Sequence, residues 1–345
     1  MQLGFFDIDT KYQRLSELGD PLEKISQLID FNMFIDIVEP ILKSRNVKSD
    51  QNPKGAGRRP LDPIMVIKIL FLKRFYNLSH PQTEYLITDR HSFQRFIGLD
   101  ANKFAPDFST IWKKEEKLTQ HGCIDAIFCR FNEFLIQQGY GASGGTIIDA
   151  TIVEVPKQRN SRKENAQIKK GKVPKRIKKN PKVMSQKDLD ARWTKKNNIS
   201  YYGYKDHITT DKDTKLITDY IVTSASMHDS QPGEFLIDPA KTDATWADSA
   251  YQTPAIRKRL KRHGIKSNIN VKGYRNKKLS RSEKIMNKKR SRIRCRVEHV
   301  FGYMENSMNG IFIKTIGIGR ALFQIGWMNT IYNMCRFTQL LDSKA

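Results

Sequence analysis

Three acidic residues stand in sequence surroundings where a carboxylate could do chemistry. The first, Asp149, lies inside the run TIIDATIVEV, whose β-branched and apolar residues predict a central strand. A carboxylate buried alone in such a strand is costly unless a partner, such as a metal ion, offsets its charge. The alternative is a strand-end acid that accepts hydrogen bonds from backbone N–H groups.

Two further acids complete a possible metal-binding set. Asp248 follows the short apolar segment 244–247, at the carboxyl end of an expected strand, where α/β sheets gather ligands. Glu298 borders the apolar stripe of a helix expected over 291–306, with Arg294 one turn earlier on the same face. Taken singly, Asp248 fits an ordinary cap, and Glu298 fits a surface ion pair. Together, two strand acids and one helical glutamate are what two-metal phosphoryl transfer requires.

The charge of the chain points to a polyanionic partner. Its 345 residues carry a net charge of +25, and two segments hold the excess. Residues 157–196 contain 16 Lys and Arg against three acids, and residues 257–296 contain 18 against one. Solvated basic loops or a targeting signal are the alternative reading. The localised pattern favours nucleic acid.

The elements that must position these residues change in type along the chain. Helical spacing over the first 140 residues includes two short helices, at about 81–88 and 91–97, that could read DNA or belong to an ordinary bundle. From residue 146 onward, strand and helix patterns alternate. We therefore expect an α+β or α/β chain: an all-helical N-terminal domain over 1–140, then a mixed sheet flanked by helices over 141–345, with a basic insertion at 157–200.

These motifs, in this order, resemble the DDE transposases of bacterial insertion sequences, particularly the insertion sequence 5 group. The segments that carry the resemblance are RRPLDPIMVIKILFLKRF, APDFSTIWKKEEKL, IIDATIVEVPKQ, YGYKDHITTDKDTKLITDYIVTSASMHDSQ, WADSAYQT and RCRVEHVFGYME. The resemblance implies an RNase H-like catalytic domain. It also implies that Asp149, Asp248 and Glu298 are the catalytic and metal-binding residues.

The same resemblance implies the activity and the partners. The enzyme would cleave the ends of an insertion element and join the 3′-OH to target DNA, using two Mg²⁺ ions, for which Mn²⁺ could substitute. Its partners would be double-stranded DNA, at the terminal inverted repeats and the target, and a second copy of the chain in a homodimer on DNA. We expect no membrane partner and a cytoplasmic, nucleoid-associated location in a bacterium. The expected DNA contacts are Arg58, Arg59, Lys205, His228, Arg294 and Arg296.

Departures and rival functions accompany this resemblance. Glu305 stands where the family often has a DNA-contacting Lys, and Ser291 replaces a frequent Tyr. Trp246, beside the second acid, could stack on a flipped base or pack in the core. The rival functions are a catalytically inactive DNA-binding protein derived from a transposase, an RNase H-like nuclease, and a basic structural protein. The last of these leaves the acid pattern unexplained.

Overall fold

The computed structural model describes residues 7–42, 61–100, 103–142, 144–275 and 277–342. The chain forms two compact units, one of Met1–Phe131 with Thr330–Ala345 and the other of Asn132–Asn329. The unit boundaries fall inside the helices α8 (Ile124–Gln137) and α16 (Ile318–Asp342). Within the described ranges, no helix is both long enough and apolar enough to cross a membrane.

The first unit is helical, as the N-terminal sequence predicts. Its helices begin at residues with short polar side chains that accept hydrogen bonds from the first turn, such as Asp62 and Asp107. Their apolar faces bury an aromatic core around Phe71. Besides parts of α8 and α16, the helices are α1 (Asp7–Glu17), α2 (Pro21–Leu28), α3 (Ile35–Leu42), α4 (Pro63–Phe75), α5 (His80–Asp89), α6 (His91–Ile97) and α7 (Phe108–Gln120).

The two short helices expected near residues 81–97 are α5 and α6, and Arg90 alone separates them. A buried ion pair ties this part of the bundle together. Lys73 on α4 donates to Glu115 on α7 at 2.9 Å, and His80 on α5 lies 2.6 Å from the same carboxylate. These links fix α5 against two other helices, so α5 is a rigid element of the bundle.

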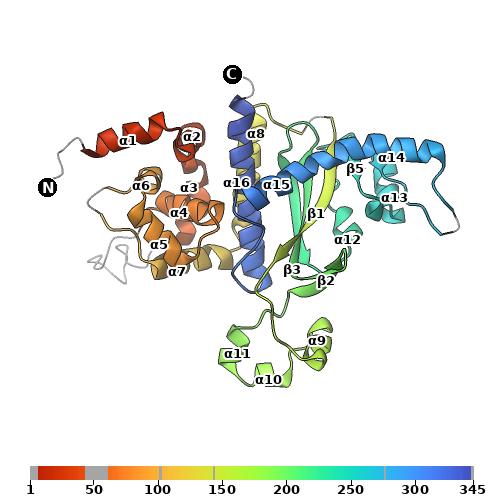
Figure 1. The fold of residues 1–345 in the computed structure, drawn as a ribbon, viewed down its shortest axis with the longest axis horizontal. Coiled ribbons are helices and arrows are strands. Elements are labelled where there is room, and N and C mark those ends of the chain that lie inside the picture. Colours follow the sequence, from red (N-terminus) through yellow and green to blue (C-terminus); the bar gives the residue numbers. More distant parts are fainter. Residues whose placement is uncertain (1–6, 43–60, 101–102, 143, 276, 343–345) are drawn as a thin grey trace. The chain divides into compact units, whose positions relative to one another are not determined.

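The second unit is built on a six-stranded mixed sheet. Its strands are β1 (Thr146–Glu154), β2 (Arg192–Lys196), β3 (Ile199–Asp211), β4 (Ile217–Ser224), β5 (Ala244–Ala247) and β6 (Lys266–Ile269). The central β1 pairs with β3 in antiparallel and with β5 in parallel orientation (Figure 1). β4 then extends the β3 edge and β6 the β5 edge. A helical N-terminal region followed by a mixed sheet with flanking helices confirms the expected fold class.

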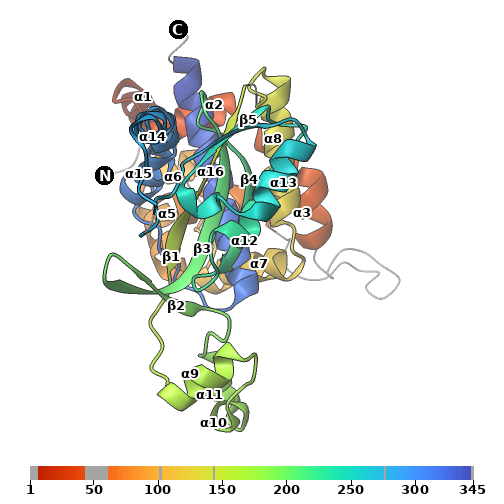
Figure 2. The same cartoon turned by 90° about the vertical axis from the view of Figure 1, so that its right-hand side faces the viewer.

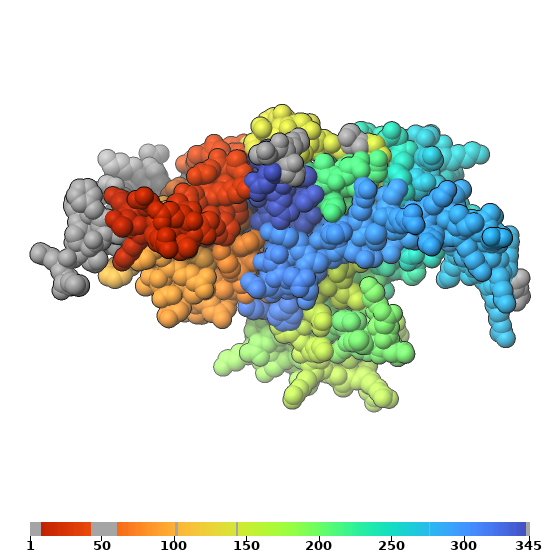
Figure 3. All heavy atoms as spheres, turned by 45° about the horizontal axis from the view of Figure 1, so that its top comes forward, coloured from red at the N-terminus to blue at the C-terminus, as the bar shows by residue number. Residues whose placement is uncertain are grey.

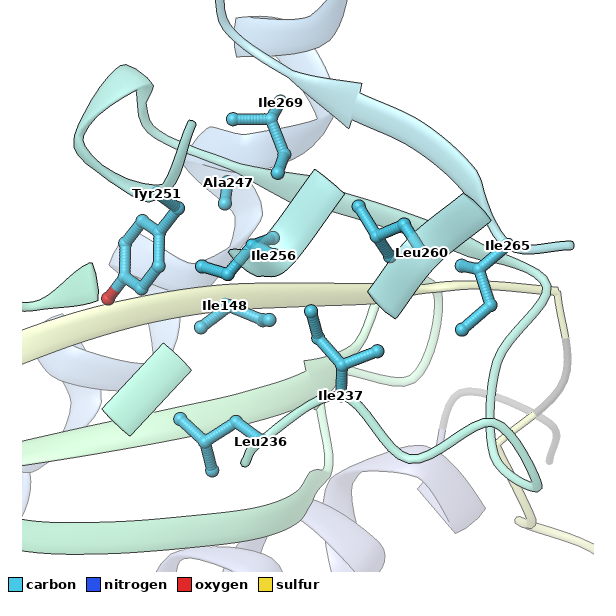
Figure 4. Close-up of a cluster of buried hydrophobic side chains, with 9 residues drawn as sticks. All are labelled: Ile148, Leu236, Ile237, Ala247, Tyr251, Ile256, Leu260, Ile265 and Ile269. Atoms are coloured by element: carbon cyan, nitrogen blue, oxygen red, sulfur yellow. The ribbon is translucent and has the colours of Figure 1, made fainter. Parts of the chain in front are cut away.

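One face of the sheet carries a compact apolar core. Ile148 on β1 packs with Ile256 and Leu260 of α13 (Pro254–Arg262), and Tyr251 closes one end of the cluster (Figure 4). Alternation along β1 places Ile148 on this face, and therefore turns its neighbour Asp149 toward the other face. The apolar packing fixes the strand that carries the first candidate acid.

The basic insertion contains ordered elements. Three short helices, α9 (Arg162–Lys169), α10 (Lys175–Lys178) and α11 (Pro181–Ser185), stand beyond one end of the sheet (Figure 2). The chain returns through a β2–β3 hairpin whose turn residues, Asn197 and Asn198, have φ angles of 49° and 63°. Both strand β2 and the first four residues of β3 lie outside the strands that the sequence predicts.

Asp188 fastens the end of this insertion to the sheet. Its buried carboxylate accepts hydrogen bonds from the Tyr204 hydroxyl at 2.9 Å and the Ala191 N–H at 2.9 Å. The Gly317 N–H, just before α16, donates to it at 3.0 Å. A single side chain thus joins three separate parts of the unit.

The helix expected over 291–306 differs from the observed structure. The chain forms α14 (Arg281–Arg294), a 3₁₀ turn at Cys295–Val297 and α15 (Glu298–Asn306). These elements form a continuous ridge on the surface of the unit (Figure 3). The apolar stretch 311–341, interrupted by polar residues, predicts an amphipathic helix. The observed α16 begins at Ile318, and most of its residues are buried.

Candidate active site

The parallel pairing of β1 with β5 brings the two aspartates together. Ile148 is in register with Ala247, and Asp149 and Asp248 are the next residues on the two strands. Asp149 is 21% exposed and accepts a hydrogen bond from the Ala150 N–H at 2.8 Å. Asp248 is exposed and caps the 3₁₀ turn Ser249–Tyr251. Asp149 is therefore held within the sheet, and Asp248 lies directly after β5, where the chain leaves the sheet.

Arg294 connects the first acid to the third. Its guanidinium donates to Asp149 Oδ2 at 2.8 Å and lies 3.6 Å from Glu298 Oε1. The sequence predicts only the local pair with Glu298. The contact with Asp149 joins residues 145 positions apart. This arginine thus places the end of α14 and the start of α15 beside the part of β1 where its pairing with β5 stops.

Electrostatics in the site favours a bound cation. Burial raises the pKa of Asp149; the Ala150 N–H and Arg294 oppose that rise, whereas the negative charge of Asp248 adds to it. Two neighbouring carboxylates with this mutual repulsion are stabilised by a cation between them. Tyr251 is 2% exposed, and burial raises its pKa well above the ordinary value, with the charge of Asp149 adding to the effect. The tyrosine therefore remains a neutral phenol.

Glu298 lies in the same region, but its side chain does not form a metal-ligand cluster with the two aspartates. Its side chain is 64% exposed. Among the residues that the structure describes, no three His, Cys, Asp or Glu side chains converge closely enough to hold a metal ion. The carboxylate oxygens present are nevertheless the donors that Mg²⁺ and Mn²⁺ prefer. The donor chemistry therefore fits divalent metal ions, and Arg294 occupies the space between two of the donors.

The expected DNA contacts have protein partners in this structure. Lys205 donates to Asp229 at 2.7 Å, His228 Nδ1 lies 2.8 Å from the Ser230 hydroxyl, and Arg296 donates to Asp213 at 2.9 Å. Apart from Arg294, none of them has a hydrogen bond or ion pair with the three acids among those found in the described ranges. Arg58 and Arg59 lie outside the described residues. A role in binding DNA stays a prediction for all six residues.

Sequence reasoning missed Tyr251 and His207. Tyr251 follows Asp248 within the quoted segment WADSAYQT, and its place in the motif was the available signal. His207 is fully buried on β3, with Nε2 2.8 Å from the Thr223 hydroxyl. Burial lowers its pKa to about 4, so the ring is neutral at pH 7. Nothing in the sequence around His207 distinguishes it from an exposed strand histidine.

The residues noted as departures and alternatives have structural roles. Ser291 accepts a hydrogen bond from Asn270 at the end of β6, and Glu305 accepts one from the Ile311 N–H at 3.0 Å. Trp246 is buried in β5, which supports core packing over stacking on a base. The site is thus built from the central strand β1, the 3₁₀ turn after β5 and the helix junction at residues 294–298.

The second unit thus has a mixed sheet, two acids at the place where the parallel central strands β1 and β5 stop pairing, and a basic helix beside them, as expected of an RNase H-like catalytic domain. Comparison with known families assigns the chain to a narrower group than its fold does. Residues 140–334 match the family described as Transposase DDE domain, and residues 10–117 match a Transposase domain (DUF772). Because the first match spans more than half of the sequence, the chain belongs to the DDE transposase family and is a DNA transposase. Members of this family generally use divalent metal ions.

One solved structure is similar to this chain. It is a cryo-EM structure of the piggyBac transposase synaptic complex with hairpin DNA. The sequence identity is 12%, the match covers 94% of this chain and 76% of that chain, and the TM-score is 0.48.

Proposed function

We propose that this transposase cleaves the ends of its own element and joins the resulting 3′-OH to target DNA, with Asp149, Asp248 and Glu298 as the metal-binding acids. The observation that carries this proposal is the placement of the acids. Two of them directly follow Ile148 and Ala247, the last residues that pair between the parallel strands β1 and β5, and Arg294 links the third to the first. The insertion sequence 5 group and a bacterial origin are part of the same proposal, and they rest on the sequence motifs.

Each residue of the site has a defined task in this mechanism. Bound divalent ions would activate the attacking oxygen and neutralise charge on the scissile phosphate. Asp149 is oriented by the Ala150 N–H, and the buried Tyr251 stays a neutral phenol within reach of the charges of the two strand acids. An incoming phosphate offers the Arg294 guanidinium an alternative anion. Exchange of Arg294 onto that phosphate would release Asp149 and Glu298 for the metal ions.

The basic segments would hold the DNA around this site. We propose that the Lys and Arg side chains of α13, α14 and the insertion at 157–200 contact DNA backbones, and that the helical domain over 1–140 recognises the terminal inverted repeats. Arg58, Arg59, Lys205, His228 and Arg296 are proposed phosphate contacts. Holding two element ends together requires a homodimer on DNA. The expected place of action is the bacterial nucleoid.

The test is a strand-cleavage assay on labelled duplexes that carry the ends of the element encoding this chain. Asp149→Asn and Asp248→Asn should lower the cleavage rate by at least about 10³-fold in Mg²⁺ or Mn²⁺ while leaving DNA affinity intact. Asp243→Asn is the matched control, because Asp243 is an exposed acid just before β5, at the opposite end of that strand from Asp248. The control should cleave like wild type.

The same assay separates the rival functions. Binding without metal-dependent cleavage by the wild-type protein would favour the inactive DNA-binding protein. Cleavage of an RNA–DNA hybrid in preference to the element ends would favour the RNase H-like nuclease. Full cleavage by Asp149→Asn would overturn the assignment of the acids.

A further inference from the structure

A groove runs along the open edge of β1, directly beyond the candidate active site. Within the described residues of the sheet, β5 pairs with β1 only as far as Ile148. The following part of β1, which includes Thr151 and Ile152, lines a groove of about 470 Å³. Thr151 lies two residues from Asp149 and therefore on the same face of the strand. The groove therefore begins two residues along β1 from the first candidate acid.

The other walls of the groove come from two separate segments. The β2–β3 hairpin contributes Lys196 and Tyr201, and the segment after α15 contributes Phe312. A β-bridge between Glu154 and Phe312 holds that segment against the end of β1. The two aromatic side chains are half-buried, and so each presents part of its ring to the groove. These walls are fixed by backbone pairing.

Charged groups of both signs border the aromatic walls. Lys196 lies close enough for its positive charge to lower the pKa of Asp149. Glu305 borders the groove, and its Oε2 accepts the Ile311 N–H at 3.0 Å, which fixes the carboxylate. A carboxylate oxygen can accept further hydrogen bonds, so an amino group of a ligand in the groove has an acceptor at Glu305. The groove therefore combines a cation, aromatic surface and a hydrogen-bond acceptor.

We propose that this groove binds one unpaired nucleotide of the DNA next to the cleavage site. This inference rests on the proposed function. The base stacks on Tyr201 or Phe312, and Lys196 faces its phosphate. Glu305 accepts a hydrogen bond from an exocyclic amino group, which cytosine, adenine and guanine possess and thymine lacks. The residue that replaces the family lysine thus becomes a selector against thymine.

The opposite face of the same hairpin provides a matched control. Trp193 pairs with Tyr202 across β2 and β3, with ring centroids 5.1 Å apart. Because side chains alternate along a strand, Tyr201 and Tyr202 lie on opposite faces of the hairpin. Trp193 is 43% exposed, so its removal deletes a comparable aromatic side chain without opening the groove.

The first experiment is photo-crosslinking of the full chain in Ca²⁺, which separates binding from cleavage. The probe is a duplex with a short single-stranded extension that contains 5-iododeoxycytidine at one position at a time. The expected adduct, mapped by mass spectrometry, lies on Tyr201 or Phe312. An adduct confined to Trp193 or Tyr202, or none on the groove at any position, would overturn the proposal.

The second experiment measures affinity for the same DNA by fluorescence anisotropy. Tyr201→Ala should weaken binding by about 5- to 150-fold, Tyr201→Phe should retain it, and Trp193→Ala should resemble wild type. An abasic nucleotide at the crosslinked position should remove the difference between wild type and Tyr201→Ala. Persistence of that difference on abasic DNA would show a structural role only and would contradict the proposal.

Base selectivity gives a third readout, which a folding defect cannot imitate. Wild type should bind a cytosine at the crosslinked position more tightly than a thymine, and Glu305→Gln should bind the two bases more equally. Equal binding of both bases by wild type would contradict the role of Glu305. Crosslinking and selectivity without Mg²⁺-dependent cleavage would leave the groove assigned and the proposed function refuted, so the two failures are distinguishable.

Discussion

The two halves of the candidate site differ in how firmly the surrounding structure holds their acidic residues. The strand half holds Asp149 on a central strand that packs on β3 and β5 and rests on the Ile148 cluster. The helix half carries Glu298, which is 64% exposed and follows a 3₁₀ break between two helices. A packed sheet resists displacement, whereas an exposed helix junction can adjust at low cost. We therefore expect the strand half to be formed in advance and the helix half to complete the proposed site when DNA and metal ions bind.

The largest effect should come from a cavity under the strand half. Ile148→Ala should lower the free energy of unfolding by about 2–5 kcal/mol, because the buried methyl groups are lost and the cluster cannot collapse fully. Urea denaturation measures this change. Ile285→Ala on α14, where the side chain is 52% exposed, should change it by less than about 0.5 kcal/mol. Similar losses for both variants would contradict the contrast between the two halves.

The next largest effect concerns Arg294, which joins the strand half of the site to the helix half. Arg294→Ala should lower the cleavage rate by about 10- to 100-fold, because Glu298 loses its link to the first acid and the phosphate loses a donor. The rate under single-turnover conditions is the readout. Arg292→Ala, an exposed arginine on the same helix, should leave that rate within a few-fold of wild type. An equal rate for Arg294→Ala and wild type would show that the halves work without this bridge.

A smaller effect tests how completely water is excluded from the strand half of the site. Burial raises the pKa of Asp206 on β3 to about 7, and its Oδ1 accepts a hydrogen bond from Asn329 at 3.2 Å. Since its ordinary pKa is near 4, the neutral carboxyl stabilises the folded protein at acidic pH, and this stability is lost as pH rises toward 7. Asp206→Asn should therefore raise the melting temperature at pH 8, by about 2–4 °C for each kcal/mol removed, and change it little at pH 4 and below, where the carboxyl is protonated in both the folded and the unfolded chain. The same shift at both pH values would argue against a buried, titrating Asp206.

The smallest effect belongs to the outer face of the helix half. Lys289→Ala on α14 should weaken binding to all DNA sequences alike and reduce the slope of log affinity against log salt by about 1. Lys241→Ala, which removes a lysine paired with Asp238 before β5, should leave the slope unchanged. A sequence-dependent loss for Lys289→Ala would instead indicate base contact.

The parts of the fold with local signals could be predicted from the sequence. The apolar run around Asp149 and the aspartate caps before α4 and α7 specify their elements through nearby residues. The β2–β3 hairpin was missed, although Asn197-Asn198 is a turn dipeptide whose side chains tolerate positive φ angles. The segments on both sides of that turn are rich in polar residues, so they lack the apolar alternation that predicts a strand.

The long-range parts of the site could not be predicted in this way. The bridge from Arg294 to Asp149 depends on how α14 packs beside the sheet, and no periodicity reports that packing. The 3₁₀ break at Cys295–Val297 is equally hidden, since its residues continue the helical apolar stripe. The sequence thus predicts the three acids, whereas the structure shows that Arg294 links two of them, Asp149 and Glu298.

The anchoring of the insertion by Asp188 has an evolutionary consequence. The chain is fastened where the insertion ends, because the Tyr204 hydroxyl and the Gly317 N–H donate to Asp188 and the Ile318 N–H donates to Asp190. We therefore expect residues between the end of β1 and Asp188 to tolerate changes of length and composition without a change in the register of the sheet. The insertion is then a segment that can diverge while the acid-bearing strand is preserved.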